Sequence, residues 1–590
     1  MTNRVDPASS RKPPIATWGV SIEHQPGGVM LLKPDLPLGP YPARVTDSLD
    51  HWAHAAPERI FLAERDGPEW RTVSYVDFRR RARALAAWLA GLGLSAENPI
   101  AILSGNDIRH AALAVAAMYA GIPYSAVSPA YSLISSDFSK LRHVTALLTP
   151  GLVFAADGTK FARAIEAAIP ANTRLIGAPE LDEIMAGPPP PQGAIASVTP
   201  DSIAKILFTS GSSGVPKGVI TTHRMLTSNQ EMLRTVFPFF SGEPLTICDW
   251  LPWNHTFGGS HNFGIALYNG GTLYIDAGRP VPGAFEETVR NLREVAPTVY
   301  FNVPKGYEML VEHLKRDRAL REQFYSRLRM TFFAAAGLSR HIWDALDELS
   351  METLGYKVPM LTGLGATETA PFAICANAEN TGAGVIGLPV PGTRLKLSPA
   401  GHKREARIKG PNVTPGFWRQ EELTRAAFDD EGFYRMGDAV RFRDAANPAR
   451  GLLFDGRISE DFKLSSGTWV SVGPLRTRLI LHFAPLVRDA VIAGPDRDQV
   501  TALLFPDPQY REQLRTEGSH LLTTFAQAAT GSSNRIVRAL IADEPPSLDA
   551  GELTDKGSVN PDAVLLRRAS VVEQLYQPPF GDGILSCFAG

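Results

Sequence analysis

The chain has 590 residues, of which 44% are hydrophobic, 20% charged and 9% aromatic, which is the composition of an ordinary globular protein. Its length is enough for several domain-sized units. A formal net charge of −2 gives no electrostatic reason to expect nucleic acid or an anionic membrane as a partner. Three scattered cysteines provide neither a disulfide framework nor a Cys-x-x-Cys metal site, which favours a reducing compartment.

The N-terminal segment and the most apolar stretch bear on localisation. Residues 1–14 are polar and contain no hydrophobic core region, which argues against a secretory signal. Residues 111–120 are alanine-rich but stop at Gly121, short of the roughly 20 apolar residues that a spanning helix needs. We therefore expect a cytoplasmic protein without integral membrane association. The sequence leaves the oligomeric state open.

The first elements predict alternating strands and helices. Ser74 can cap a helix with Asp77 three residues later, and that helix ends near residues 91–93. An apolar strand at 100–103, a helix at 108–119 and a strand at 124–127 follow, an order that builds a parallel sheet. Residues 273–301 repeat the strand–helix–strand order. The pattern predicts a doubly wound α/β body for about the first three quarters of the chain.

A loop rich in glycine and hydroxyl groups follows the apolar residues 206–208. Its glycines allow backbone N–H groups to approach an anion, its hydroxyls donate, and its lysine adds charge. These residues are Thr209, Ser210, Gly211, Ser212, Ser213, Gly214, Lys217 and Gly218. The loop departs from the common nucleoside triphosphate pattern because Lys217 lies between Pro216 and Gly218. Residues 219–222 predict a second strand, so we interpret the segment as a phosphate-holding hairpin; the alternative is a flexible surface turn.

The pattern of predicted secondary structure changes after residue 395. Residues 395–416 carry short β segments and turns, which predict an antiparallel or barrel-like subdomain. Residues 456–467 have the composition of a domain boundary. Beyond it, strands at 487–492 and 500–505 and helices at 510–516, 521–529 and 563–576 suffice for a small α+β domain.

Four more motifs accompany the loop in a fixed order along the chain. They are Leu-Pro-Trp-Asn-His (251–255), Gly-Leu-Gly-Ala-Thr-Glu (363–368), Tyr-Arg-Met-Gly-Asp (434–438) and Asp-Gly-Arg (455–457). With the loop, they resemble the signature of the adenylate-forming superfamily of acyl-CoA and aryl-CoA ligases, luciferases and peptide-synthetase adenylation domains. Within this superfamily, the amino-acid sequence at 253–259, 305–308 and 551–557 is most similar to that of the bacterial feruloyl-CoA synthetase group. The resemblance implies a large body, residues 1–456, and a small mobile α+β lid, residues 457–590.

The resemblance also implies a nucleotide site. Residues 209–214 and Lys217 would hold phosphates, Glu368 and Thr209 would bind Mg²⁺, and Asp438 would bind the ribose hydroxyls. The remaining members of this expected site are Gly363, Gly365, Thr367 and Arg457. The structural alternatives are an exposed helix start at Glu368, a local turn cap at Asp438 and a structural ion pair at Arg457.

Two further sets of residues follow from the resemblance. The acyl pocket would be lined by His255, Phe257, Ala334, Ala335, Ala336 and Gly337. Lys556 would be the lid lysine that stabilises charge at the α-phosphate, in a Thr-Asp-Lys-Gly context that departs from the usual Gly-Lys. The hinge and CoA channel would involve Ser459, Glu460, Lys463, Gly467 and Thr468. The alternatives are a structural role for the lone His255 and a tightly packed strand end at 334–337. For Lys556, Lys463 and Thr468 the alternative is a solvated surface residue.

The expected activity is an ATP-dependent ligase that uses Mg²⁺ and coenzyme A to convert a small carboxylic acid, such as ferulate, to a CoA thioester. A medium- or long-chain fatty acid ligase, a unit that loads a carrier protein, and a catalytically silent nucleotide-binding protein are the alternatives. The motifs do not fix the acid.

Overall fold

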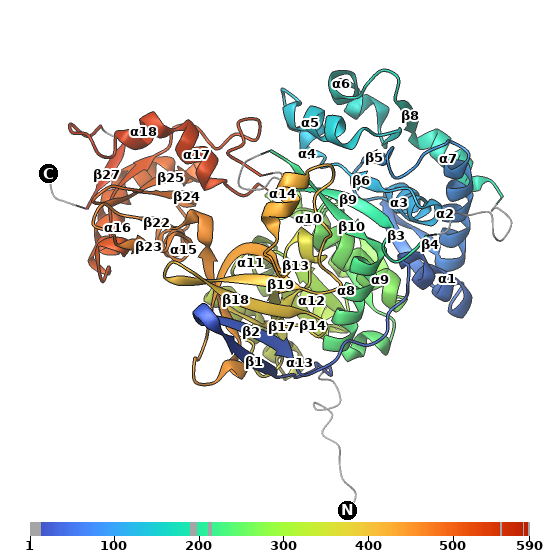
Figure 1. Cartoon of the computed structure of the whole chain (residues 1–590), viewed down its shortest axis with the longest axis horizontal. Coiled ribbons are helices and arrows are strands. Elements are labelled where there is room, and N and C mark those ends of the chain that lie inside the picture. The colour runs from blue at the N-terminus through green and yellow to red at the C-terminus, as the bar shows by residue number, and fades with distance from the viewer. Residues whose placement is uncertain (1–12, 189–197, 210–214, 555–556, 582, 588–590) are drawn as a thin grey trace, which may run out of the picture.

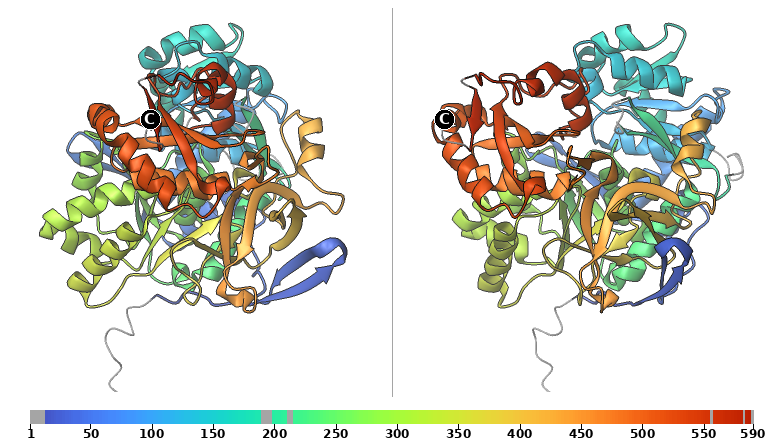
Figure 2. Two further views of the ribbon diagram at one scale, coloured as in Figure 1. Left: turned by 90° about the vertical axis from the view of Figure 1, so that its left-hand side faces the viewer. Right: turned by 60° about the vertical axis from the view of Figure 1, so that its left-hand side comes forward.

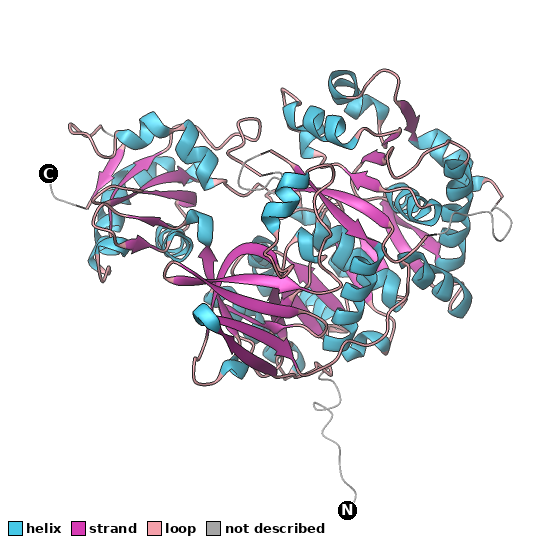
Figure 3. Ribbon diagram, viewed as in Figure 1, coloured by secondary structure: helices cyan, strands magenta, loops and turns pink. Residues whose placement is uncertain are grey.

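The computed structural model describes residues 13–188, 198–209, 215–554, 557–581 and 583–587. Figure 1 shows the C-terminal elements to one side of a large body, and Figure 2 shows the same arrangement from two further sides. Figure 3 shows helices packed around the strands in much of both parts, whereas the strands that include β1 and β2 lie at the surface of the body. None of the helices in the described ranges is long and apolar enough to cross a membrane.

Two sheets form the first part of the body. The six-stranded sheet has the order β10 (Lys217–Thr222), β9 (Ile203–Thr209), β6 (Tyr124–Ala126), β5 (Ile100–Leu103), β7 (Leu152–Ala155) and β8 (Arg174–Gly177). The four-stranded sheet has the order β11 (Thr246–Asp249), β12 (Thr272–Ile275), β3 (Ile60–Asp66) and β4 (Glu69–Ser74). In the first of these sheets β5, β6 and β7 pair in parallel, as predicted, whereas β9 and β10 form the predicted antiparallel hairpin.

An eleven-stranded sheet forms the rest of the body. Its order is β1 (Val20–Gln25), β2 (Val29–Pro34), β18 (Arg394–Ala400), β19 (Lys403–Lys409), β20 (Tyr434–Phe442), β21 (Leu452–Arg457), β17 (Val385–Pro389), β16 (Ile374–Cys375), β15 (Met360–Leu364), β14 (Met330–Phe333) and β13 (Val299–Asn302). The predicted antiparallel region after 395 thus merges with parallel strands through β15 to β17. The predicted unit at 273–301 is wrong as a single sheet unit, because β12 and β13 lie in different sheets.

The helices of the body cover these sheets. They are α1 (Val45–Ala55), α2 (Tyr75–Ala90), α3 (Ile108–Ala120), α4 (Ala130–Leu133), α5 (Ser139–Leu148), α6 (Gly158–Ala168), α7 (Ala178–Ala186), α8 (His223–Val236), α9 (Phe263–Asn269), α10 (Phe285–Glu294), α11 (Pro304–Arg316), α12 (Arg318–Tyr325), α13 (Arg340–Leu354) and α14 (Glu421–Ala427). Ser74 caps α2 by accepting from the Asp77 N–H, as predicted. The alanine-rich stretch is α3, a helix buried on nearly every side in the largest apolar cluster.

The small C-terminal domain has its own sheet and core. The sheet has the order β24 (Val487–Ala493), β25 (Val500–Pro506), β26 (Ile536–Ile541) and β27 (Ile584–Ser586). Its other elements are the hairpin β22 (Phe462–Lys463) and β23 (Trp469–Val470), and the helices α15 (Val472–Phe483), α16 (Arg511–Gln527), α17 (Pro561–Arg567) and α18 (Ala569–Glu573).

Two helix predictions in this domain are wrong. The segments 510–516 and 521–529 form one helix, α16, because Gly518 continues it and gives room to Leu585, whose Cδ1 lies 2.6 Å from where a Cβ would be. The predicted helix 563–576 is divided at Arg568, where the chain leaves helical geometry between α17 and α18. The Arg568 guanidinium bonds both carboxylate oxygens of the fully buried Glu552.

Candidate active site

The hairpin of β9 and β10 places Thr209 opposite Lys217. The Lys217 ammonium lies 3.0 Å from a carboxylate oxygen of Glu368 and 4.3 Å from the centre of the Phe417 ring. Thr209 Oγ1 is buried and has no hydrogen-bond partner within the described part of the chain. The predicted phosphate ligands Ser210, Gly211, Ser212, Ser213 and Gly214 lie outside the described residues.

Glu368 is held inside a short 3₁₀ turn, Thr367–Thr369, after β15. Its backbone carbonyl accepts from the Thr414 N–H at 2.8 Å, and its side chain is only 7% exposed. The carboxylate also receives a hydrogen bond from the Tyr434 hydroxyl. Burial, followed by the charge of Glu368, raises the pKa of Tyr434 well above its ordinary value, so this hydroxyl stays a donor. Glu368 is therefore a buried carboxylate between an ammonium and a phenol, and not an exposed helix start.

Gly363 and Gly365 are required by close backbone packing. A Cβ on Gly363 would lie 2.4 Å from the Ile374 carbonyl oxygen, and a Cβ on Gly365 would lie 1.5 Å from that of Pro371. The chain that these glycines contact is the return segment after the Glu368 turn. The two glycines therefore let this turn fold back tightly on β15 and fix the position of Glu368.

Asp438 and Arg457 are paired residues on β20 and β21. Arg457 Nε lies 3.5 Å from a carboxylate oxygen of Asp438, so the arginine does make an ion pair. Burial raises the pKa of Asp438 to about 6; the Arg457 charge lowers it, and the charges of Glu460 and Glu368 raise it. Gly437, in left-handed backbone geometry with φ +71°, precedes the aspartate. A buried carboxylate near the Glu368 carboxylate is suited to accept hydrogen bonds from neutral hydroxyls.

The residues predicted for an acyl pocket fall on two neighbouring segments. His255 lies just before a π-helix, η3 (Phe257–Asn262), and Asn254 Nδ2 lies 3.4 Å from its Nε2. The Phe257 ring packs at 6.5 Å from Phe301 on β13 and 6.4 Å from Phe332 on β14.

The four small residues follow β14 directly. Ala334 is half-buried, and Ala335, Ala336 and Gly337 are exposed. Ala335 has a φ of +75°, a left-handed conformation that alanine rarely adopts. The segment is therefore a turn that directly follows β14, the strand that carries Phe332.

The residues predicted for the hinge lie in a 3₁₀ turn, Ile458–Glu460. Burial raises the pKa of Glu460. The next residue, Asp461, is anchored in both directions: a carboxylate oxygen lies 2.5 Å from the Lys403 ammonium of β19, and the other accepts from the Val472 N–H at 3.0 Å. This buried ion pair ties the start of the small domain to the body.

The predicted CoA-channel residues lie on the exposed hairpin of β22 and β23. Lys463 pairs with Trp469 and lies over its ring at 5.1 Å. Gly467 forms the turn with φ +80°, and the Thr468 carbonyl accepts from the Leu464 N–H. The Trp469 ring lies 5.0 Å from that of His402, so the hairpin contacts the turn between β18 and β19.

Lys556 lies outside the described residues, but the loop before it contacts the body. Lys140 on α5 donates to the Leu548 carbonyl at 2.8 Å. Ser136 donates to Asp549 through both its N–H, at 3.0 Å, and its hydroxyl, at 2.7 Å. The loop is therefore docked beside α4 and α5, a contact that no motif in the sequence predicts.

Sequence reasoning also missed Tyr434 as a partner of Glu368. The residue lies on β20 and Glu368 lies after β15, so their contact depends on the tertiary fold. The register shift between β19 and β20 and the left-handed geometry of Gly437 also interrupt the simple alternation of faces along residues 434–438.

A magnesium site would draw few ligands from this chain. Among the described residues there is no group of three or more His, Cys, Asp or Glu side chains that could hold a metal ion. Mg²⁺ commonly binds through one or two carboxylates and substrate phosphates. The buried Glu368 carboxylate and the Thr209 hydroxyl, which has no hydrogen-bond partner among the described residues, fit that pattern.

Comparisons with known proteins identify both parts of the chain. Residues 49–418 match the model of the AMP-binding enzyme family, and residues 462–579 match that of the AMP-binding enzyme C-terminal domain.

The relatives come from several functional groups. Carboxylic acid reductase of Mycobacterium marinum is 28% identical over 419 residues, which cover 65% of this chain and 34% of that protein. Benzoate–CoA ligase of Thauera aromatica is 29% identical over 339 residues, which cover 55% of this chain and 60% of that protein. The match thus spans less than two thirds of the length of either relative.

Solved structures share the fold. ATP-bound MatB from Rhodopseudomonas palustris superposes with a TM-score of 0.68 at 22% identity, covering 89% of this chain and 99% of that one. The architecture is therefore the adenylate-forming fold, with a large N-terminal and a small C-terminal domain.

Proposed function

We infer that this chain, which belongs to the AMP-binding enzyme family, is an ATP-dependent acid–CoA ligase that forms an acyl-adenylate and then a CoA thioester. The observation that carries the inference is the cluster around Glu368. Its carboxylate lies 3.0 Å from Lys217, which is paired with Thr209 across a hairpin, and its charge acts on the nearby Asp438. In this proposal these groups supply the cation, hydroxyls and carboxylates that bind a nucleoside triphosphate.

The proposed chemistry has two balanced steps. A carboxylate oxygen of the acid attacks the α-phosphorus of ATP, the bond to the β-phosphate oxygen breaks, and pyrophosphate leaves. The CoA thiolate then attacks the acyl carbon, and AMP leaves with the electron pair of the C–O bond.

This chain's residues have distinct proposed roles in these steps. Asp438 accepts hydrogen bonds from the ribose hydroxyls, and Lys217 and the loop from Thr209 hold the phosphates. Lys556 would bring a cation to the α-phosphate. Mg²⁺, held by Glu368 and Thr209, would neutralise charge on the phosphate oxygens.

For the acid, we propose a hydroxycinnamate such as ferulate. The wall formed by Phe257, Phe301 and Phe332 supports an aromatic substrate, because rings pack favourably edge to face. The residues at 334–337, which follow the strand that carries Phe332, have short side chains, and three of them are exposed. The similarity to a benzoate–CoA ligase also favours an aromatic acid. A fatty acid ligase is the alternative for the same apolar wall.

A second function is an adenylation unit that transfers its acyl group to a carrier protein. The observation in its favour is the match to carboxylic acid reductase, which covers 65% of this chain. Both functions share the adenylation step and differ only in the thiol that accepts the acyl group.

We also propose that residues 1–456 form the body and 457–590 a lid that rotates between the two steps. The turn Ile458–Glu460 supports a pivot there, since it lies between β21 and the anchored Asp461. Rotation would exchange Lys556 for the hairpin that carries Lys463, Gly467 and Thr468.

Pyrophosphate–ATP exchange tests the first step. With ATP, Mg²⁺ and a panel of aromatic and aliphatic acids, but without CoA, exchange should depend on the acid. Glu368→Gln should lose exchange, and Lys160→Met, on a surface helix, should retain it. Adding CoA should then release a thioester. Nucleotide binding without exchange across the panel would refute the ligase, and exchange without a thioester would favour the carrier-loading unit.

A further inference from the structure

The π-helix η3 has an unusual environment. A π-helix places its hydrogen bonds one residue further along the chain than an α-helix does, and such turns are frequent at functional sites. In η3 the Phe263 N–H accordingly bonds the Gly258 carbonyl. One side of η3 lies against backbone, because Cβ atoms on Gly258 and Gly259 would lie 2.3 and 2.2 Å from the carbonyl oxygens of Leu251 and Trp253.

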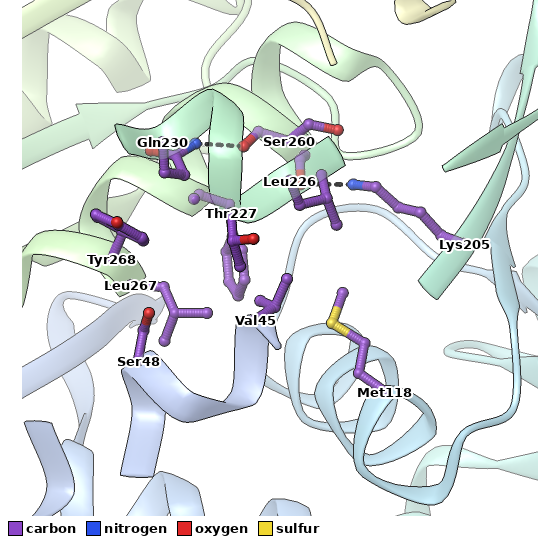
Figure 4. A pocket seen from close by; sticks show the side chains of 13 residues that line it. Val45, Ser48, Met118, Lys205, Leu226, Thr227, Gln230, Ser260, Leu267 and Tyr268 are labelled. Atoms are coloured by element: carbon purple, nitrogen blue, oxygen red, sulfur yellow. Dashed lines mark hydrogen bonds between the residues drawn. The ribbon is translucent and has the colours of Figure 1, made fainter. Parts of the chain in front are cut away.

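Two side chains from other elements bond three successive carbonyls of η3. The Lys205 ammonium on β9 donates to the Gly259 carbonyl at 2.9 Å. Gln230 Nε2 on α8 donates to the Ser260 carbonyl at 2.9 Å and to that of His261 at 3.3 Å. Figure 4 shows the two side chains approaching the same turn from different elements. We call Lys205 and Gln230 the carbonyl clamp.

The clamp is inaccessible to bulk water. Lys205 is 1% exposed and Gln230 4% exposed. Both line a small cavity of about 30 Å³ behind η3, whose other walls come from α1, α3 and α9. Burial lowers the pKa of Lys205 to about 7. An apolar side chain would fill such a position at less cost, so the amine is explained by its hydrogen bond and not by packing.

The π-helix η3 also contributes two rings, Phe257 and His261, to the aromatic wall. The rings of Phe257 and His261 lie 5.3 Å apart, and His261 packs at 5.2 Å from Phe301 and 5.7 Å from Phe332. A shift of the η3 backbone would move both rings together, because they lie on one turn of it. The clamp holds this backbone through three of its carbonyl groups.

We propose that Lys205 and Gln230 are positioning residues that hold η3 in register, set the position of Phe257 and His261, and thereby determine which acids the enzyme accepts. This inference rests on the proposed function, since it takes the aromatic wall as the acyl site. Neither clamp residue contacts the acid itself.

The test uses the full-length variants Lys205→Met and Gln230→Met, with the exposed Lys160→Met on α6 as the matched control. Hydrogen–deuterium exchange of the free protein is the first measurement. Each clamp variant should speed exchange of amides in 256–264 by about tenfold, the effect of losing one buried hydrogen bond, with the rest of the body unchanged. Unchanged exchange in 256–264, or an equal rise throughout the body, would overturn the proposal.

Acid selectivity is the second measurement. The ratio of kcat/KM between a hydroxycinnamate and a short aliphatic acid should change by about tenfold or more in the clamp variants, while KM for ATP stays constant. A purely structural role would lower activity toward all acids alike, and that result would refute the proposal.

A milder variant covers the case in which the clamp variants do not fold. A Cβ at Gly264 would lie 2.3 Å from Gln230 Nε2, so Gly264→Ala should displace the glutamine alone and give the same local exchange. If wild-type protein activates no acid, the proposed function fails, and the exchange measurement still decides whether the clamp holds η3.

Discussion

Replacing Asp438 by Asn should stabilise the protein while removing nucleoside binding. Asn has the same shape but does not ionise. Burial raises the pKa of Asp438 from 3.8 to about 6, so the folded state disfavours the carboxylate. A shift of about 2 units corresponds to about 3 kcal/mol, because one unit is about 1.4 kcal/mol.

The sign follows from linkage. The loss of stability from burying the ionised Asp438 carboxylate is absent below the ordinary pKa of 3.8, grows as pH rises, and is complete above about pH 6. Asp438→Asn should therefore raise the free energy of unfolding by about 3 kcal/mol at pH 7.5 and by only about 1 kcal/mol at pH 4.5. Thermal unfolding of both proteins at the two pH values measures this difference.

Adenosine binding provides the functional half of the test, since the nucleoside carries the ribose hydroxyls but no titrating phosphate. Wild-type affinity should fall about tenfold for each pH unit below about 6, as the carboxylate protonates. The Asn variant should bind weakly at every pH. Arg457→Ala should move the wild-type transition to higher pH, because the Arg457 charge lowers the pKa of Asp438. An Asn variant that is less stable than wild type at pH 7.5 would refute the cost of burying the Asp438 carboxylate. An Asn variant that binds adenosine normally would refute the ribose role.

Three further predictions follow from other contacts. Gly365→Ala should destabilise the body by about 3 kcal/mol or more, because its Cβ would lie 1.5 Å from the Pro371 carbonyl oxygen. The control Gly105→Ala, with open space around the glycine, should leave stability unchanged. Thermal unfolding of the two variants compares these effects. Lys140→Ala removes a donor to the docked loop, so pyrophosphate exchange should slow while thioester formation from supplied acyl-adenylate is retained; equal loss of both would contradict a role in docking. Ser459→Pro should preserve exchange but suppress thioester formation, as rapid-quench assays would show, and normal CoA turnover would place the pivot elsewhere.

Local signals in the sequence predicted much of the fold. Ser74 and Asp77 predicted the start of α2, and the apolar residues beside the glycine-rich loop predicted the β9–β10 hairpin. The errors arose where distant contacts decide. Gly518 continues a helix because Leu585 fills the space beside it, and neither residue indicates this alone.

The candidate site was predicted at the level of motifs and not of contacts. Motif order pointed to Glu368 and Asp438, but only the structure shows that Lys217 and Tyr434 bond the same carboxylate. The buried position of Lys205 could not be predicted from the sequence, because a lysine in a strand normally indicates an exposed face. Its burial depends on η3, more than 50 residues away in sequence, whose carbonyl groups need a donor.

The two buried ionisable groups, Asp438 and Lys205, should give opposite pH trends. The pKa of Asp438 is raised, so the loss of stability from burying its carboxylate grows with rising pH. The pKa of Lys205 is lowered from 10.5 to about 7, so the loss of stability from burying its ammonium is complete below about pH 7 and disappears above pH 10.5. The stability gained by Lys205→Met should therefore be largest at and below about pH 7 and shrink toward pH 10. A constant loss from the unpaired Gly259 carbonyl is subtracted from this gain at every pH. The gain from Asp438→Asn should instead reach its full value above pH 6 and stay there. Thermal unfolding of both variants from pH 5 to 10 compares the trends. A gain for Lys205→Met that does not fall with rising pH would show that the lysine is hydrated, and not held dry against η3.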